Sequence, residues 1–433
     1  MKTTILRFIS LTFSKLKFIT KEDKYNLQKI GSGYGGNTVN TSIFRRNSLA
    51  THNDIQVISY YDKKGYIIIG KRKINETKWQ IKKLSLTGNI RDAHNIISIE
   101  LDGEGYIHMA YGMHNKKLNY LVSEKPYSLR MMPVKELDGV EEDSITYPEF
   151  YRLENGDLLL AYWNGKSGNG NLILKRYYVK QKKWKTIQSN LIDGEGERNA
   201  YCQMSVGNNG KIYLSWVWRE NPDVSSNHDI CYAFSNDYGE TWQKSSGDVY
   251  ELPITLKSAE IIVNIPEGSN LMNQGGICEN PNGYPLIATY WQAKGEDGPQ
   301  YHTLCFNGEY WKVDTVGRRN IPFQLRGRGT KNVPISRPCV FCSEKKVYIL
   351  VRDKERGSKI TLGEKDENMR NEWSFRDLTS FNVEAWEPTI DWDLWKEKNL
   401  LNIFVESTMQ KDGNDKSKAS SRSKPVYVLS LQL

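Results

Sequence analysis

Apolar positions along the chain recur in short runs of about four to eight residues, separated by turns rich in Gly, Asn or Asp. In the recurring unit, an apolar strand and a turn lead to a more apolar strand and then to a polar strand, often close to a Trp. The seven copies contain IQVISYYDKKGYIIIGKR, NIISIELDGEGYIHMAYG, YPEFYRLENGDLLLAYWNG, QMSVGNNGKIYLSWVWR, GICENPNGYPLIATYW, RPCVFCSEKKVYILVRD and EPTIDWDLWKEKNLLNIFVE. This pattern predicts an all-β protein.

The second unit predicts a β-hairpin with a histidine at each side of its open end. His94 precedes the first strand and His114 follows the second, so both imidazoles are expected at the same end of the sheet. They form a candidate acid/base pair because imidazole titrates near neutral pH, or they only cap strands. The expected elements are a strand at Asn95–Leu101, a turn at Asp102–Gly105, a strand at Tyr106–Tyr111 and a third strand at Leu118.

The repeat length of roughly 40 to 70 residues is typical of four-stranded propeller blades with loops of variable length. We therefore predict a seven-bladed β-propeller with four-stranded antiparallel blades at 36–433, after an N-terminal tail at 1–35. The C-terminal VYVLSLQL is expected to close the last blade. The alternative, an array of β-sandwiches, predicts shorter and more regular units without such a closing strand.

One turn carries a specific motif. Ser235–Trp242 (SNDYGETW) fits the Asp-box pattern S-x-D-x-G-x-x-W, in which the Asp bonds turn amides, the Gly takes positive φ and the Trp packs between strands. This motif is typical of hairpin turns in propellers and is structural. We therefore do not expect Asp237 to be catalytic.

The net charge of +9, from 60 Lys and Arg against 51 Asp and Glu, favours an anionic ligand. The basic residues form no tract, which argues against nucleic acid, and no apolar run is long enough to span a bilayer. Six cysteines without paired CxxC motifs predict buried thiols. Basic residues interrupt the N-terminal apolar run, so the residues give no clear signal peptide. We expect a monomer.

Ligands of propellers bind at the end of the ring, among loops between blades. Residues suited to sugar stacking or carboxylate pairing stand where strands begin or end, at Tyr147, Trp163, Tyr201, Arg219 and Arg337. For each of them alone, an ordinary strand-end residue is the simpler interpretation, and their recurrence at comparable blade positions favours a site. Two acidic residues of the seventh unit are expected on one strand and are interpreted as structural; they are Glu387 and Asp391.

Several segments together resemble the BNR-4 repeat family from about Val39 to the C-terminus. They are DAHN…GYIHMAYGMHNKKLNY, TYPEF…YWNGKSGNGN, the Asp-box, SRP and WEPTID. The resemblance implies a seven-bladed propeller that acts on acidic polysaccharides. The family includes lyases for ulvan and for rhamnose–glucuronate linkages, and α-L-rhamnosidases of the same fold. It also implies a secreted or periplasmic enzyme.

The resemblance to the lyases assigns His94, His114 and Tyr147 to catalysis, and Tyr201 and Arg219 to substrate binding. An arginine of the family pattern falls at Trp163 here, which is a departure. The implied reaction is β-elimination, in which Arg219 pairs with the uronate carboxylate. His94 or His114 accepts the C5 proton and Tyr147 protonates the leaving O4, or these two roles are exchanged.

Three hypotheses follow. The first is a polysaccharide lyase. The second is an α-L-rhamnosidase that uses His52 on the opposite face, and the third is a propeller that binds acidic glycan without turnover. The lyase reaction requires no cofactor. A structural divalent metal, zinc or calcium, is compatible with the resemblance, and His228 and Cys231 have the spacing of ligands.

Overall fold

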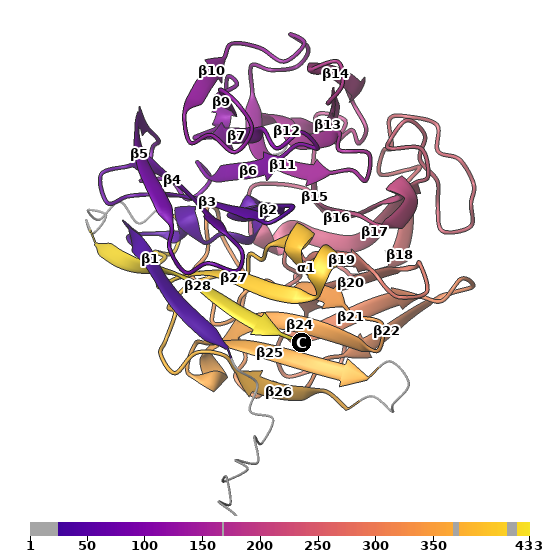
Figure 1. Ribbon diagram of the computed structural model, residues 1–433. Coiled ribbons are helices and arrows are strands. Elements are labelled where there is room, and N and C mark those ends of the chain that lie inside the picture. Colours follow the sequence, from indigo (N-terminus) through magenta and orange to yellow (C-terminus); the bar gives the residue numbers. More distant parts are fainter. Residues whose placement is uncertain (1–24, 167–168, 367–371, 414–421) are drawn as a thin grey trace, which may run out of the picture.

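The computed structural model describes residues 25–166, 169–366, 372–413 and 422–433. Seven antiparallel sheets surround a central axis, and each contains consecutive strands of the chain except the last and the second and third, between which β8 (His114–Lys116) crosses (Figure 1). The predicted all-β class and seven-bladed propeller are therefore confirmed. In the described part of the chain, the only α-helix is the short α1 (Trp392–Lys398), and no helix is long and apolar enough to cross a membrane.

The first four blades contain the following strands, in order from the inside of the ring outward. The first has β2 (Leu49–His52), β3 (Ile55–Tyr61), β4 (Tyr66–Lys73) and β5 (Gln80–Thr87). The second has β6 (Ile97–Leu101), β7 (Ile107–Tyr111), β9 (Tyr120–Ser123) and β10 (Met131–Val134). The third has β11 (Ile145–Arg152), β12 (Leu158–Lys166), β13 (Asn169–Tyr178) and β14 (Lys183–Gln188). The fourth has β15 (Asn199–Val206), β16 (Ile212–Arg219), β17 (Asn227–Ser235) and β18 (Glu260–Val263).

The remaining blades follow the same order. The fifth has β19 (Gly276–Glu279), β20 (Pro285–Trp291), β21 (Gln300–Phe306) and β22 (Trp311–Thr315). The sixth has β23 (Cys339–Cys342), β24 (Lys346–Asp353), β25 (Lys359–Asp366) and β26 (Ser374–Asp377). The seventh has β27 (Leu400–Glu406), β28 (Ser423–Gln432) and β1 (Asn26–Tyr34), and a bridge between Ile390 and Ile403 supplies its innermost position.

Strands near the axis are buried on both faces because neighbouring blades cover them. All five residues of β6 are buried, and so are the first seven of β16. In contrast, Leu84 is the only buried residue of the outermost strand β5. This gradient explains why the second apolar run of each unit is the stronger one.

The predicted hairpin of the second blade is confirmed, with β6 and β7 antiparallel and Ile97 opposite Tyr111. The region after it differs from the prediction. A short strand, β8 (His114–Lys116), leaves the second blade and pairs with β11 of the third, where His114 lies opposite Thr146. The third strand of the blade, β9, begins only at Tyr120. This crossing of β8 brings a histidine of one blade next to the first strand of the next blade.

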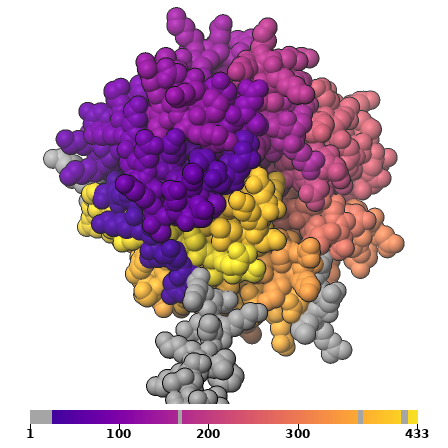
Figure 2. All heavy atoms as spheres, in the orientation of Figure 1, coloured from indigo at the N-terminus to yellow at the C-terminus, as the bar shows by residue number. Residues whose placement is uncertain are grey.

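The N-terminal boundary at residue 35 is wrong. Asn26–Tyr34, which the sequence analysis assigned to a tail, forms β1 and pairs antiparallel with the C-terminal strand β28. Figure 2 shows the same closure, since the indigo N-terminal strand packs against the yellow C-terminal segment. The two glycines of NLQKIGSGY obscure its strand pattern, and its partner lies about 400 residues away in sequence. The two ends of the chain therefore close the ring together.

Gly33 of β1 provides a test of this closure. A Cβ atom at this position would lie 2.6 Å from a carboxylate oxygen of the buried Glu406. We expect Gly33→Val to lower the free energy of unfolding by about 1–3 kcal/mol in denaturant titrations, because the extra methyl groups force strands β1 and β27 apart. The matched control is Ser32→Val, since Ser32 is the exposed neighbour on the same strand. Equal stability of the two variants would contradict this packing.

The Asp-box turn forms as predicted. Asp237 accepts a hydrogen bond of 2.9 Å from the amide of Thr241, and Gly239 has a φ of +94°. The indole of Trp242 is buried and donates to the carbonyl of Gly239. The motif stabilises a turn after β17, and Asp237 is engaged in that turn.

Helix α1 lies near the middle of the ring on the face seen in Figure 1. Arg152, at the end of the innermost strand β11, forms ion pairs of 3.3 Å with Asp393 and 3.2 Å with Glu397 of this helix. The helix therefore lies at the end of the ring where inner strands finish. The opposite end, where inner strands begin, is open to a cavity.

Candidate active site

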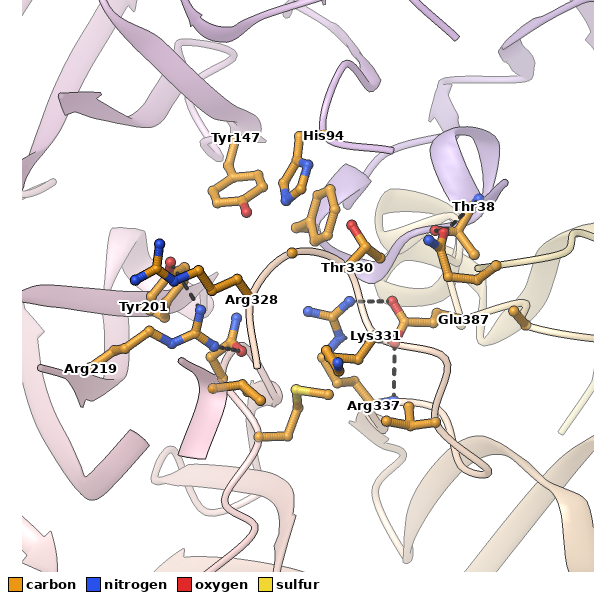
Figure 3. Close-up of a pocket in the computed structure, with 18 of the residues that line it drawn as sticks. Thr38, His94, Tyr147, Tyr201, Arg219, Arg328, Thr330, Lys331, Arg337 and Glu387 are labelled. Carbon is orange, nitrogen blue, oxygen red and sulfur yellow. Dashed lines mark hydrogen bonds and ion pairs between the residues drawn. The ribbon is translucent and has the colours of Figure 1, made fainter. Parts of the chain in front are cut away.

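A cavity of about 270 Å³ lies at the end of the ring where inner strands begin (Figure 3). The second, third and fourth blades contribute histidine and tyrosine side chains to it, and the long loop between β22 and β23 arches over it. Its lining includes six of the residues predicted from the sequence to bind or convert substrate; these are His94, His114, Tyr147, Tyr201, Arg219 and Arg337.

Asp92 lies between the two predicted histidines. Its carboxylate oxygens accept hydrogen bonds of 2.6 Å from Nδ1 of His94 and 2.6 Å from Nδ1 of His114. The imidazole rings stack with centroids 4.2 Å apart, which confirms that both project from the same end of the sheet. Because each Nδ1 faces the carboxylate, we assign the proton to Nδ1, which leaves Nε2 of each ring as an acceptor.

The surroundings of His94 favour its neutral form. Burial lowers its pKa below the usual range and outweighs the bond and charge of Asp92, which raise it; His114 and Arg337 lower it further. Burial also opposes ionisation of Asp92, but the hydrogen bonds from His114 and His94 hold the pKa of that carboxyl below its usual range. At neutral pH the pair Asp92–His94 is therefore a carboxylate with a neutral imidazole, which is the state of a general base.

Tyr147 reaches the cavity from an irregular part of β11. The ladder with β12 is interrupted between Thr146 and Glu149, and Tyr147 has a φ of +52°, a strained value for an aromatic residue. Its ring lies 5.7 Å from that of His94 and 4.6 Å from that of Phe44, measured between centroids. Burial raises the pKa of Tyr147, with Tyr201 as the next cause, so the phenol stays protonated and can donate a proton.

Arg219 is a cation of the cavity whose hydrogen-bond partners are neutral. Its Nε and Nη2 donate to the amide oxygens of Asn227 and Asn273, each at 2.7 Å. Its guanidinium also lies 4.4 Å from the ring centroid of Tyr201 and donates to that hydroxyl at 3.3 Å. Within residues 25–166, 169–366, 372–413 and 422–433, no carboxylate forms an ion pair with Arg219. Its charge is thus oriented and remains available to an anionic ligand.

Arg337 differs from Arg219 because its charge is already neutralised. Its Nε and Nη2 donate to the two carboxylate oxygens of Glu387, at 2.8 and 2.6 Å. Burial opposes the charge of Glu387, but Arg337 holds the pKa of that carboxyl below its usual range. The expectation that Glu387 and Asp391 share a strand is wrong: Glu387 lies outside any strand and lines the cavity, and Asp391 caps α1. Arg337 therefore contributes to the wall of the cavity as half of an ion pair.

The loop between β22 and β23 adds groups that the sequence analysis did not identify. Arg328, Thr330 and Lys331 line the cavity, and Figure 3 shows them on the loop that crosses it. Lys331 forms an ion pair of 2.9 Å with Asp412, and the amide of Gly413 donates to Thr330. The loop is therefore tied to the seventh blade, and Arg328 brings further positive charge to the cavity.

Trp163 and His52 lie in different places. Trp163 is 7% exposed and lines a second cavity that adjoins the first. His52 is the last residue of β2, at the end of the ring where inner strands finish, and its Nδ1 bonds the hydroxyl of Tyr127 at 2.8 Å. The predicted hydrolase residue is therefore on the opposite face from the histidine pair, as expected.

The proposed pair of metal ligands does not meet. His228 lies between Glu220 and Asp229, at 2.9 and 3.0 Å, whereas the thiol of Cys231 is buried in an apolar cluster of the blade. Within the described residues, Asp92, His94 and His114 form the one group close enough to hold an ion. Each Nδ1 there already lies at hydrogen-bond distance from the carboxylate, which accounts for the arrangement without a metal.

Asp92→Asn tests the role of the carboxylate. Asp92 raises the pKa of His94, so its loss lowers that pKa. A base works only above its pKa, and the acid limb of the pH profile of kcat/KM should therefore move to lower pH. The amide also no longer fixes the Nδ1 proton, and we expect kcat/KM at neutral pH to fall at least about tenfold. A pH profile of both enzymes measures the two effects, and an unchanged acid limb would contradict the coupling.

The fold and the site define a β-propeller with a histidine–tyrosine–arginine site at one end of the ring. A model described as a BNR repeat-containing family member matches residues 55–319, more than half of the chain, and the chain belongs to this family. Ulvan lyase of Nonlabens ulvanivorans is 24% identical over 238 residues, which are 46% of this chain and 48% of that protein. The long isoform of ulvan lyase from an Alteromonas species is 28% identical over 133 residues, 28% of this chain and 13% of that protein.

The chain thus spans about half the length, or less, of the curated relatives it matches. Two solved structures of an ulvan lyase, described as a new family of polysaccharide lyase, are similar over 93% of this chain and 95% of theirs. Their TM-scores are 0.70 and 0.71 at 16% and 15% identity, and the second is bound to -[GlcA(1-4)Rha3S]-. At this level of identity the likeness shows the shared propeller fold.

Sequence reasoning missed three kinds of group. Asp92 stands two residues before His94, and a D-x-H spacing at a turn was the available signal, since its side chain accepts from the amide of His94. Arg328 and Lys331 lie in a loop without periodicity, where sequence gives no register. Glu387 was noticed but was placed on a strand that does not form.

Proposed function

We propose that this protein is a polysaccharide lyase that cleaves a rhamnose–glucuronate type linkage in an acidic polysaccharide by β-elimination. The observation that carries the proposal is the neutral imidazole of His94, fixed by Asp92 beside the protonated phenol of Tyr147. A base and an acid side by side are what an elimination needs. The ulvan lyase relatives support the same reaction class.

The uronate carboxylate pairs with Arg219. This cation is oriented by two amide oxygens and has no carboxylate partner among the described residues, so a ligand carboxylate can complete its hydrogen bonding. Neutralising the carboxylate makes the C5 proton more acidic, because the negative charge that develops at C5 spreads onto the carboxylate. Arg328 adds to the positive potential of the same cavity, whereas the charge of Lys331 is paired with Asp412.

His94 accepts the C5 proton at Nε2. The electron pair of the C5–H bond forms the C4=C5 double bond, and the C4–O4 bond breaks. The phenol of Tyr147 gives its proton to the leaving O4, so that charge does not accumulate on the oxygen. Asp92 stabilises the imidazolium that forms, as the carboxylate partner of a catalytic histidine does in other enzymes. No redox step occurs, and each proton has a donor and an acceptor.

The departure at Trp163 is compatible with this scheme. The resemblance assigns an arginine to that position, and here Arg219 stands across the cavity with its charge free. Arg219 therefore takes over the neutralisation of the carboxylate. We also propose an extracellular or periplasmic location, since a polymer of this kind reaches the enzyme outside the cell.

The direct test follows absorbance of the unsaturated uronate while the protein acts on ulvan and, separately, on rhamnose-capped arabinogalactan. Free sugars are measured in parallel. A rising absorbance establishes elimination. Rhamnose released without absorbance would indicate the hydrolase alternative with His52, and binding without either product would indicate a glycan-binding propeller.

A further inference from the structure

A second cavity of about 310 Å³ adjoins the first, and the two share three lining residues, His114, Tyr147 and Tyr201. Tyr147, the acid of the proposed elimination, thus stands between the two cavities, and the base His94 lines the first. We refer to the cavity that contains Arg219 as the cationic arm and to the second as the neutral arm. A linear glycan can occupy both at once.

The two arms differ in charge. The cationic arm is lined by Arg219, Arg328 and Arg352, in addition to the ion pairs of Lys331 with Asp412 and of Arg337 with Glu387. Apart from the three shared residues, the neutral arm is lined by residues without charge, which are Asn115, Thr146, Trp163, Gly165, Gly170 and Asn199. Electrostatic complementarity therefore directs an acidic sugar to one arm and disfavours it in the other.

We propose that the neutral arm binds the sugar that leaves through O4, and that it selects an uncharged, unsulfated sugar. This inference rests on the proposed lyase function. Tyr147 donates the proton to O4 and lines both cavities. The C4–O4 bond that breaks must therefore lie next to Tyr147, at the junction of the two cavities. With the uronate held by Arg219 on one side, its neighbour across O4 lies on the other side, against Trp163.

The lining of the neutral arm fits a sugar without charge. Trp163 offers an indole surface, and apolar C–H faces of sugars pack on such surfaces. Asn199 is 7% exposed, and its Oδ1 is buried without a hydrogen-bond partner among the described residues. This oxygen can accept from a sugar hydroxyl. A sulfate in the same place would lose water without gaining a cation, which is costly.

The test compares ulvan with chemically desulfated ulvan as substrates, with kcat/KM taken from the unsaturated-uronate absorbance. We expect the desulfated polymer to be preferred by about tenfold or more, as for a site whose polar groups match only one of two ligands. Trp163→Arg introduces a cation and should shift the ratio toward the sulfated polymer by a similar factor. The matched control is Tyr310→Arg, which makes the same type of change at a 60% exposed turn of the fifth blade.

Because Trp163 is buried, a second variant covers the case in which Trp163→Arg does not fold. Asn115 is exposed at the rim of the neutral arm and has a φ of +52°, which Asp also tolerates. Asn115→Asp should lower kcat/KM for the sulfated polymer several-fold more than for the desulfated one. An equal effect on both polymers would contradict the proposal that this arm discriminates between sulfated and unsulfated sugars.

The possible outcomes test the selectivity of the neutral arm separately from the proposed lyase function. Turnover of both polymers with equal kcat/KM, or with the sulfated one preferred, would contradict the proposed selectivity of the neutral arm. It would leave the proposed lyase function intact. If neither of these polymers nor rhamnose-capped arabinogalactan yields the unsaturated product, the proposed function fails. In that case calorimetric binding of the two polymers still decides the selectivity: tighter binding of desulfated ulvan supports the neutral arm, and equal or weaker binding overturns it.

Discussion

His94→Gln is expected to lower kcat/KM for elimination by about 10²- to 10⁴-fold, the range for loss of a general base. Glutamine can fill much of the space of imidazole and can bond Asp92, but it cannot accept the C5 proton. The ring of His94 packs beside Phe44 and His114, with centroids 5.8 and 4.2 Å away. The substitution is therefore expected to change chemistry more than packing, and KM should change less than kcat.

The matched control for His94→Gln is His52→Gln at the other end of the ring. His52 bonds Tyr127 and takes no part in the proposed elimination, so its variant should keep the activity of the wild type. The two variants also separate the two enzymatic hypotheses. Loss of activity in His52→Gln with retention in His94→Gln would place the chemistry on the opposite face and support the hydrolase.

Arg219→Gln should produce a second large effect, a loss of about 10²- to 10³-fold in kcat/KM, as when one charge-stabilising group is removed from a transition state. The carboxylate then lacks its partner while charge develops at C5. Arg219 also lowers the pKa of Tyr147, so its loss makes the phenol a weaker acid. Arg219→Lys keeps the charge but cannot bridge Asn227 and Asn273, and we expect an intermediate rate.

The control for Arg219→Gln is Arg130→Gln. Arg130 has 65% of its side chain exposed and pairs with Glu124 in the turn between β9 and β10, away from the cavity. Its loss removes the same charge from the protein without touching the site. If both variants lost activity to the same degree, the effect of Arg219 would reflect net charge and not a contact with the carboxylate.

The histidine pair could be predicted from sequence because a hairpin brings the residue before its first strand close to the residue after its second strand. His94 and His114 are separated by a turn whose register is fixed by alternation, and the pairing of Ile97 with Tyr111 follows from it. Tyr147 was found in the same way, from its place at the start of a blade. Its contact with the histidines also depends on β8, whose crossing to the third blade the sequence did not indicate.

Other features depend on contacts between segments far apart in the chain. The pairing of β1 with β28 joins the two ends of the protein, and its glycines gave no alternation to detect. The ion pair of Arg337 with Glu387 links the sixth and seventh blades across 50 residues. Because of this ion pair, Arg337, which was predicted to bind substrate, forms part of the cavity wall. These contacts depend on how the blades pack into a ring, and the local sequence pattern does not predict them.

The cavity's charge asymmetry is likewise a property of the assembled ring. Composition gave a net charge of +9, which predicts an anionic ligand without locating it. Arg219 comes from the fourth blade, and Arg328 and Lys331 come from a loop before the sixth. Only the closed propeller gathers them on one side of Tyr147 and leaves Trp163 on the other.

The most direct test of the central claim is the absorbance of unsaturated uronate during digestion of ulvan, desulfated ulvan and rhamnose-capped arabinogalactan by the wild type and by His94→Gln. The account predicts a rise with the wild type on at least one of these polymers, almost none with His94→Gln, and an unchanged rise with His52→Gln. Rhamnose released by the wild type without any rise in absorbance would contradict elimination at the Asp92–His94–Tyr147 site.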